Sequence, residues 1–406
     1  MRWIFVAAFL VFTGVFAGAA FAQEKPTARP EVGQPVAQAG QLLKEKKYKE
    51  ALQKLAAADA VPDKTPYERY VIEGTRAAID LNSGDDRGAI KALDAVLATG
   101  ILSPQDALVR LEALVQLDYK VKDFPQTIAA AERYYQQGGT AAEPRLLEAQ
   151  AYYQQGDFAG AARTVRAILQ ADTKAGKKPD ENLLLTLVSS EYQQKNEAGR
   201  IDALERLVAL YPKPQYWTDL LAAVAKQPGF ASDRLALDLD RIKLATGAMS
   251  SANDYMEAAQ LALLAGLPGD AKAILDKGYA AGKLGKDAQA DREKRLAAMA
   301  AQQAGDDAKT LAQQESEAAK AANGLAWEKL GEAYASYGQY DRAIAAYQKA
   351  LQKGGLSRPD DAKLHLGIAY LAAGQSARAK ETLSAITGAD GTRALARLWL
   401  IHGEAQ

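Results

Sequence analysis

The fold of this chain can be read from residues 326–351, AWEKLGEAYASYGQYDRAIAAYQKAL. Trp327, Leu330 and Tyr334 recur at intervals of three and four residues, which places them on one face of a helix. A short polar turn follows, and the same spacing resumes as far as Tyr347. The stretch therefore predicts two amphipathic helices joined by a tight turn.

Two small residues occupy the expected contact between these helices. Gly331 and Ala343 fall where an antiparallel pair approaches most closely, because a larger side chain would hold the backbones apart. With them, the segment resembles the tetratricopeptide repeat, whose signature is Trp, Leu, Gly, Tyr, Ala, aromatic and Ala. The final proline of that signature is absent, and Gly354-Gly355 ends the helix instead.

Similar pairs recur along the chain. The clearest second copy is LLEAQAYYQQGDFAGAARTVRAIL, which begins at Leu146. The contact position of the second helix recurs about every 36 residues, close to the repeat length of this family. Its predicted positions are 51, 89, 127, 161, 201, 236, 271, 343 and 379. Most are Ala, but Ile201 is too large for the site, which leaves the register of that pair open. A turn is also predicted at Gly305-Asp306-Asp307.

The resemblance implies an all-α fold, a right-handed superhelical solenoid of about ten tetratricopeptide-like helix pairs. Residues 286–322 have few large apolar side chains and read as an eroded repeat or, alternatively, a helical spacer between two arrays. The predicted organisation is a signal peptide (1–22), a Pro-rich disordered tether (23–35), an N-terminal array (36–285), the weak segment (286–322), a C-terminal repeat pair (323–388) and a capping helix (389–406).

The N-terminal residues read as an export signal. Arg2 is followed by an apolar run and by Ala20-Phe21-Ala22, which is typical of a cleavage site before Gln23. The sequence thus predicts a periplasmic protein, and the alternative is a retained inner-membrane anchor that faces the periplasm. The chain has no cysteine, which excludes lipidation at a cysteine.

Composition disfavours several classes of function. Fifty basic and fifty acidic residues leave no net charge, whereas a nucleic-acid binder usually carries a basic excess. His365 and His402 are the only histidines, and neither has a nucleophile or a second imidazole nearby in sequence. We therefore expect no enzyme, no catalytic residue, no metal site and no cofactor.

The expected activity is protein binding. In proteins of this resemblance the first helices of the pairs line a groove, at repeat positions two, five, nine, twelve and thirteen, and these positions imply contact residues here. The implied contacts are Leu146, Gln150, Tyr153, Met256, Gln260, Leu263, Glu328, Glu332, Leu364 and Ile368. For each aliphatic residue the alternative is a place in the core between repeats. Glu328 and Glu332 argue against a clamp for a terminal carboxylate, since such a clamp uses basic residues.

The predicted function is a periplasmic scaffold that binds another envelope protein or peptide segment. The stretch LYPKPQYWTDL, which begins at Leu210, looks similar to a segment of tetratricopeptide proteins associated with TonB-type energy transduction. The alternatives are an accessory protein of envelope biogenesis or secretion, and a solenoid solute-binding protein. Contact with a membrane is expected only through a partner unless the signal is retained.

Overall fold

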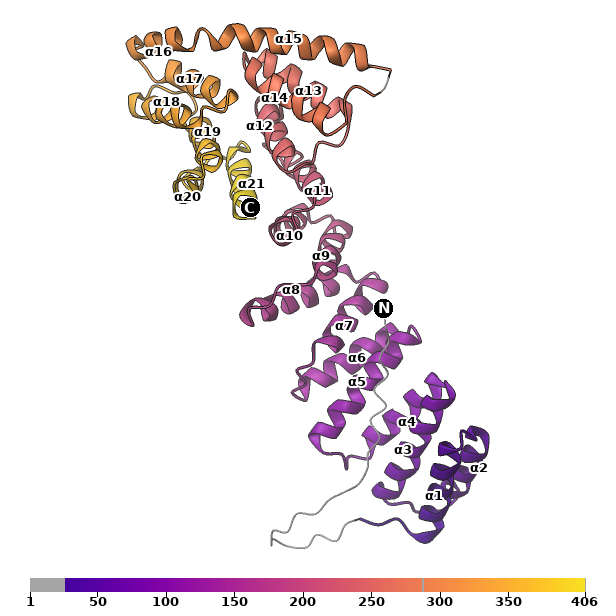
Figure 1. Cartoon of the computed structure of the whole chain (residues 1–406). Coiled ribbons are helices and arrows are strands. Elements are labelled where there is room, and N and C mark those ends of the chain that lie inside the picture. Colours follow the sequence, from indigo (N-terminus) through magenta and orange to yellow (C-terminus); the bar gives the residue numbers. More distant parts are fainter. Residues whose placement is uncertain (1–25, 287, 406) are drawn as a thin grey trace. The chain divides into compact units, whose positions relative to one another are not determined.

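The computed structural model describes residues 26–286 and 288–405 (Figure 1). The predicted signal peptide, residues 1–22, lies outside the described residues. Within the described ranges all regular secondary structure is helical, which confirms the expected all-α repeat fold. No helix among the described residues is long and apolar enough to cross a membrane. The chain divides into two compact units between Leu147 and Glu148.

The first unit is built from consecutive helix pairs. Each helix packs on the next, and the small buried residues Ala51 and Ala89 lie in the cores of the first two pairs. Its helices are α1 (Pro30–Lys44), α2 (Tyr48–Asp59), α3 (Pro66–Ser83), α4 (Asp86–Ala98), α5 (Pro104–Lys120), α6 (Phe124–Gln136) and the beginning of α7 (Ala142–Gln154).

The sequence Thr65-Pro66-Tyr67-Glu68 predicts the start of a helix, with Thr as cap, Pro at the first position and Glu three residues after the cap, and α3 begins there. Thr65 Oγ1 accepts a hydrogen bond from Glu68 N at 3.2 Å, and Glu68 Oε2 accepts one from Thr65 N at 2.9 Å. This reciprocal pair satisfies two backbone donors that the first turn of a helix leaves without partners. Pro66 occupies the first helical position, where a missing N–H costs nothing.

Helix α1 corrects the predicted tether. Residues 30–35 were expected to be disordered, but they form the first turns of α1, with Pro30 at the position that best tolerates proline. Val32 is fully buried against Ala58 and Ile72. Burial of that side chain against the first two pairs outweighs the poor helix propensity of the segment.

The second unit contains the rest of α7 and fourteen further helices in the part of the chain that the structure describes. These are α8 (Phe158–Lys174), α9 (Glu181–Gln193), α10 (Glu197–Leu210), α11 (Pro214–Ala225), α12 (Ser232–Ala245), α13 (Ala252–Leu264), α14 (Pro268–Ala280), α15 (Ala290–Ala308), α16 (Leu311–Lys320), α17 (Leu325–Ser336), α18 (Tyr340–Lys353), α19 (Pro359–Ala372), α20 (Ser376–Ser384) and α21 (Thr392–Glu404).

The close contact between α17 and α18 is confirmed. A Cβ atom added to Gly331 would lie 2.7 Å from the ring of Tyr347, which is shorter than any normal carbon contact. Ala343 is fully buried in the same interface. The small residues therefore set the separation of these two helices, as the sequence predicted.

Two predicted registers are wrong by one residue. Ala161 N donates to Asp157 O, the residue that caps α8, and Arg200 N makes the same bond to Asn196 O at the start of α10. Arg200, not Ile201, therefore takes the position of Ala161. By the same criterion Leu235, not Ala236, holds this position in α12. The predicted register follows the recurring alanines. Arg200 and Leu235 hold the equivalent positions in α10 and α12, and because they are not alanines the sequence could not locate them.

The weak segment contains one long helix. Helix α15 continues through Gly305 to Ala308, so the turn predicted at Gly305-Asp306-Asp307 is wrong. A Cβ at Gly305 would meet no atom within 4 Å, and nothing at this point forces the helix to end. α15 packs on α14, and α16 packs on α17.

The C-terminal helix returns to the middle of the second unit. α21 packs on α19 and α20, and also on α10 and α12, beside which Figure 1 shows it. Leu398 and Trp399 of α21 share one hydrophobic cluster with Trp217 of α11. The segment was predicted to cover an open end of the stack, but earlier helices of the same unit enclose it. This contact joins parts of the chain that no local pattern relates.

Candidate partner-binding surface

A repeated turn gives the register of each pair from the structure itself. Gln339 N donates to Tyr334 O at 2.9 Å where α17 turns into α18. The corresponding bonds in three earlier pairs are Asp85 N to Asp80 O, Asp123 N to Asp118 O and Asp157 N to Tyr152 O. Residues at equal distances from these turns are therefore equivalent.

Three exposed aliphatic side chains of the first unit occupy groove positions in this register. Val109 corresponds to Leu325, Leu146 to Glu328, and Leu81 to Ala335. The side chains of Leu81, Val109 and Leu146 are 44%, 51% and 36% exposed. Leu146 was predicted as a contact, whereas Leu81 and Val109 were not, because their pairs match the repeat signature less well. We call these three residues the inner apolar face of the first unit.

Negative charge borders this face. Glu112 is equivalent to Glu328, and burial together with the nearby charge of Glu143 raises its pKa. Gly74 holds the same repeat position in α3, and a Cβ there would meet no atom within 4 Å. No contact with the described residues explains a glycine at this helical site, so among these residues the surface over Gly74 is open.

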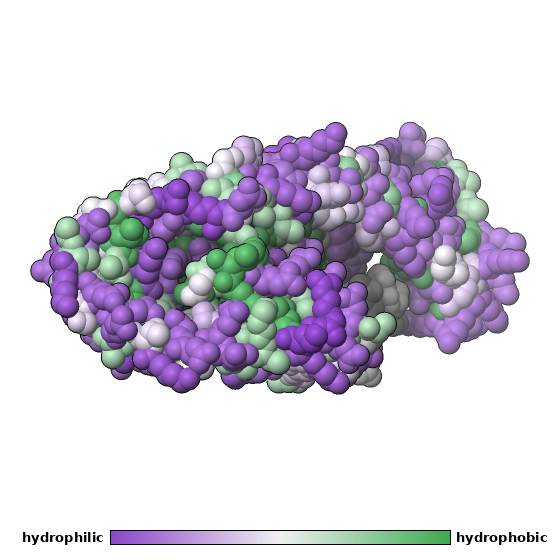
Figure 2. All heavy atoms as spheres, turned by 90° about the horizontal axis from the view of Figure 1, so that it is seen from above, coloured by the Kyte–Doolittle hydropathy of each residue, from purple (hydrophilic) through white to green (hydrophobic). Residues whose placement is uncertain are grey.

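The surface is otherwise mostly polar. Figure 2 shows hydrophilic residues over most of the face seen from above, with hydrophobic residues in separate groups among them. Single exposed apolar residues are common on soluble proteins. Exposed aliphatic residues that recur at groove positions of the repeat are less common and indicate a surface for a partner.

Gln150 and Tyr153, at the start of the second unit, are half-buried. Tyr153 Oη lies 2.6 Å from Ser189 Oγ of α9, and its ring meets Phe158 edge to face with centroids 5.2 Å apart. Tyr153 thus takes part in packing α7, α8 and α9 while one side of its ring remains accessible. Both residues remain predicted contacts.

Met256 and Gln260 border a cavity of about 240 Å³ between α13 and the beginning of α15. Asn253, Glu257 and Arg292 complete its polar walls. Met256 itself is buried, and Leu263 is half-buried against the same core. This part of the predicted surface is therefore a small polar recess.

Leu364 is a correction to the predicted contacts. Leu364 is fully buried, and Ile368 packs against the same hydrophobic cluster, which α10, α11 and α21 also build. Leu364 is therefore a core residue and not a partner contact, whereas Ile368 is half-buried against the same helices.

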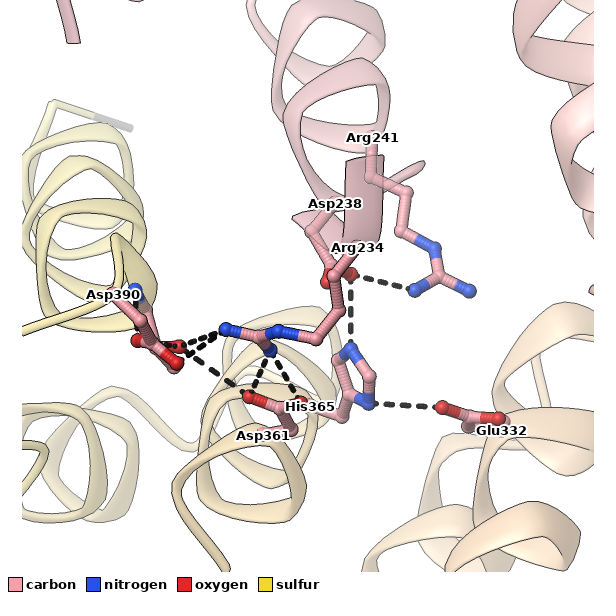
Figure 3. Close-up of polar contacts among 8 residues, drawn as sticks. Arg234, Asp238, Arg241, Glu332, Asp361, His365 and Asp390 are labelled. Carbon is pink, nitrogen blue, oxygen red and sulfur yellow. Dashed lines mark hydrogen bonds and ion pairs between the residues drawn. The ribbon is translucent and has the colours of Figure 1, made fainter. Parts of the chain in front are cut away.

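Glu332 belongs to a buried ionic cluster around His365, which Figure 3 shows between two carboxylates. His365 Nε2 lies 2.9 Å from Asp238 Oδ1, and His365 Nδ1 lies 3.2 Å from Glu332 Oε1. Burial alone would lower the pKa of His365, but Asp238 and Glu332 overcome this effect and raise it to about 10. The histidine is thus a fixed cation at neutral pH. Glu328 lies near this cluster, and burial followed by the charge of Glu332 raises its pKa.

A second ionic cluster joins α12 to the first turn of α19 and to the loop before α21. Arg234 Nη1 donates to Asp361 Oδ1 at 2.6 Å, and its Nη2 donates to Asp390 Oδ2 at 2.5 Å (Figure 3). Backbone contact continues the connection, since Ala231 N donates to Asp390 O at 2.8 Å. The forked guanidinium suits two carboxylates at once. Sequence reasoning missed this cluster because its partners are 127 and 156 residues apart.

These clusters fasten helices together. Carboxylates from two different helices, Asp238 of α12 and Glu332 of α17, lie 2.9 and 3.2 Å from the two ring nitrogens of His365. Within residues 26–286 and 288–405 no three His, Asp or Glu side chains are grouped as metal ligands.

Comparison with known proteins agrees with the repeat pattern. A tetratricopeptide repeat family model matches residues 334–398. No curated protein matches the sequence.

Three solved structures are similar at low identity. A tetratricopeptide repeat protein from Parabacteroides merdae is 12% identical, with 84% of this chain and 99% of that chain covered and a TM-score of 0.32. The C-terminal part of a TPR repeat-containing protein from Cytophaga hutchinsonii is 14% identical over 80% and 98%, with a TM-score of 0.31. Yeast Tom70 is 11% identical over 91% and 94%, with a TM-score of 0.26.

Proposed function

We propose, on the premise that this chain is a tetratricopeptide repeat protein, that its first unit binds a segment of a partner protein and that the chain acts as a scaffold. The observation that carries this proposal is the inner apolar face. Leu81, Val109 and Leu146 come from three consecutive pairs, occupy groove positions of the repeat and remain exposed. Exposed apolar side chains cost solubility, and a partner that covers them removes this cost.

The partner chemistry follows from the surroundings of this face. Glu112 and Glu143 place negative charge beside Val109 and Leu146. A helical or extended segment with aliphatic side chains and flanking Lys or Arg residues would match both features. The partner would approach closely over Gly74, where the helix surface has no side chain.

The second unit is a poorer candidate for the same role. The inner side of α10 and α12 is covered by α21, and the ionic clusters around Arg234 and His365 bind these elements together. A partner would have to displace the chain's own helix. We therefore assign the partner site to the first unit, and Gln150 and Tyr153 of the second unit remain separate predicted contacts.

The site of action proposed is the bacterial periplasm. The support is the export-type N-terminal sequence, with Ala20-Phe21-Ala22 before Gln23. The narrower hypothesis of a TonB-type system has the short resemblance beginning at Leu210 as its support. Sequencing the N-terminus of the protein from fractionated cells tests the location: Gln23 as first residue in the periplasmic fraction supports it, and a cytoplasmic protein beginning at Met1 contradicts it.

The scaffold function is tested by comparing what variants capture. Tagged protein would be isolated from detergent-solubilised envelopes and its partners identified by mass spectrometry. A Leu81→Asp, Val109→Asp double variant should lose a partner that the wild type retains, because two charges disrupt the apolar face. Met299→Asp is the matched control, since Met299 is 43% exposed on α15 of the second unit and lies outside the groove positions.

A partner lost in the double variant and kept in the control supports the proposal. Identical capture by all three proteins contradicts it. Recovery of TonB-type motor or receptor components would favour the narrower hypothesis, and a different set of envelope proteins would discard that system.

A further inference from the structure

A second candidate site lies where α3 and α5 begin, outside the predicted groove positions. A groove of about 580 Å³ is bordered by Tyr67 and Tyr70 of α3 and by Ile101 and Leu102 of the loop before α5. Ile101 is 42% exposed, although it is a large aliphatic residue. All lining residues belong to the first unit.

The tyrosine pair forms an aromatic wall with unused polar groups. The two rings are one helical turn apart, with centroids separated by 6.3 Å and planes inclined by 34°. In the described part of the chain neither hydroxyl group makes a hydrogen bond, so both are available as donors. Such a wall offers a flat apolar surface together with a polar edge.

An extended segment of the chain already forms the opposite border. Pro26 and Thr27 line the groove, and Arg29 has φ −56° and ψ 149°, the values of a polyproline II helix. Arg29 fixes this segment on α3, because its Nε and Nη2 donate to the two carboxylate oxygens of Glu68 at 2.8 and 2.9 Å.

This anchor is firmly held. The side chain of Glu68 is 0% exposed, and the hydrogen bonds from Arg29 lower its pKa to about 2. The carboxylate of Glu68 therefore stays ionised and paired with Arg29 across the physiological pH range.

We propose that this groove binds an extended, proline-containing segment of a partner protein that carries a basic side chain. Proline rings of a polyproline II segment pack on aromatic walls, and its backbone carbonyls, which make no internal hydrogen bonds, accept from tyrosine hydroxyls. The half-exposed carboxylate of Asp106 at the α5 side supplies the charge for a Lys or Arg. Such a segment is already rigid, so its binding costs little conformational entropy.

Asp106 remains free to act in this way. Its Oδ2 accepts from Ser103 Oγ at 2.6 Å, and the nearest cation, Arg110 Nη1, lies 3.6 Å from its Oδ1. This weak ion pair leaves most of the carboxylate charge uncompensated. The charge of the groove and its aromatic wall thus favour the same ligand class.

The test uses the full chain and a defined peptide. Fluorescence anisotropy would follow a fluorescein-labelled peptide, Pro-Pro-Lys-Pro-Pro-Arg-Pro-Pro, and a control peptide in which Gly and Ser replace the prolines. We expect saturable binding of the first peptide only. A Tyr67→Ala, Tyr70→Ala double variant should bind at least about tenfold more weakly, as expected for loss of aromatic anchors.

Three controls make the outcome decisive. Tyr192→Ala, which removes a 59% exposed tyrosine of the second unit, should not change binding. Asp106→Asn should weaken binding and reduce its dependence on salt. The Leu81→Asp, Val109→Asp variant should still bind the peptide, which separates this site from the proposed scaffold surface.

Equal binding of both peptides, or unchanged binding by a double tyrosine variant with native circular dichroism, would overturn the proposal. Loss of binding in the Leu81→Asp, Val109→Asp variant would also overturn it, because the peptide would then occupy the inner apolar face.

Discussion

Gly331 and Gly305 are both helical glycines, but their surroundings differ. Gly331 faces the Tyr347 ring at a distance that admits no side chain, whereas a Cβ at Gly305 would meet open space. We expect Gly331→Leu to lower the free energy of unfolding by about 1–3 kcal/mol or more, because it forces α17 and α18 apart. The matched change Gly305→Ala should raise it by about 0.5–1 kcal/mol, since alanine is the better helix former. Urea denaturation of the full chain measures the free energy of unfolding of both variants. Equal changes in the two variants would contradict the register assigned to α17 and α18.

His365 gives a stability term with a defined pH dependence. Its pKa is raised in the folded chain, so the stabilisation is complete below the unfolded value of about 6.5 and is lost as pH rises through about 10. His365→Gln leaves Asp238 and Glu332 without their shared cation and should cost about 3 kcal/mol at pH 7.

Urea denaturation at pH 7 and pH 10.5 tests this dependence. The difference between wild type and His365→Gln should be large at the lower pH and small at the higher one. His402 is the control, because burial lowers its pKa and its substitution should show no such decrease. A difference of equal size at both pH values would contradict the prediction.

Asp118 should destabilise the folded chain at neutral pH, whereas His365 stabilises it. Burial, with the nearby charges of Asp123 and Asp94, raises its pKa to about 7, so the folded chain loses stability as pH rises from about 4 to 7. Asp118→Asn removes this cost and should raise the melting temperature at pH 8 by several degrees. The gain should vanish near pH 4. Asp219→Asn, at an exposed position, should change neither value.

Helix α21 stabilises elements that are distant in sequence. Its residues Leu398 and Trp399 pack in the same cluster as Trp217, and Arg397 pairs with Glu205 of α10. Truncation before α21 should therefore increase amide hydrogen exchange in α10, α11 and α12 as well as in α19 and α20. If only α19 and α20 lose protection, α21 stabilises its neighbours in sequence and does not stabilise α10, α11 and α12.

Sequence predicted those elements whose evidence is local. The contact of Gly331 and the start of α3 at Thr65 depend on residues within one pair, and both are confirmed. The helix at residues 30–35 and the burial of Leu364 depend on residues elsewhere in the fold, and both were predicted wrongly. Spacing within a repeat cannot reveal a contact between repeats that are far apart.

For the candidate site too, the sequence predicted the residues that have local evidence and missed those that depend on distant contacts. Leu146 was found because its pair matches the signature well, whereas Leu81 and Val109 belong to weaker copies. The ionic cluster of Arg234 with Asp361 and Asp390 has no sequence signal, because single charged residues on helices are common and their pairing is set by tertiary structure.

At the scale of the whole molecule, the two units differ in how far apart in sequence their contacting helices lie. In the first unit the contacts join neighbouring helices, which suits folding from local interactions. In the second unit, α21 covers α10 and α12 although it is the last helix of the chain. During synthesis α21 leaves the ribosome after every helix on which it packs. The first unit can thus fold while translation continues, whereas α10 and α12 wait for α21 before their apolar side is covered, and a polypeptide released before α21 is made would keep that side exposed.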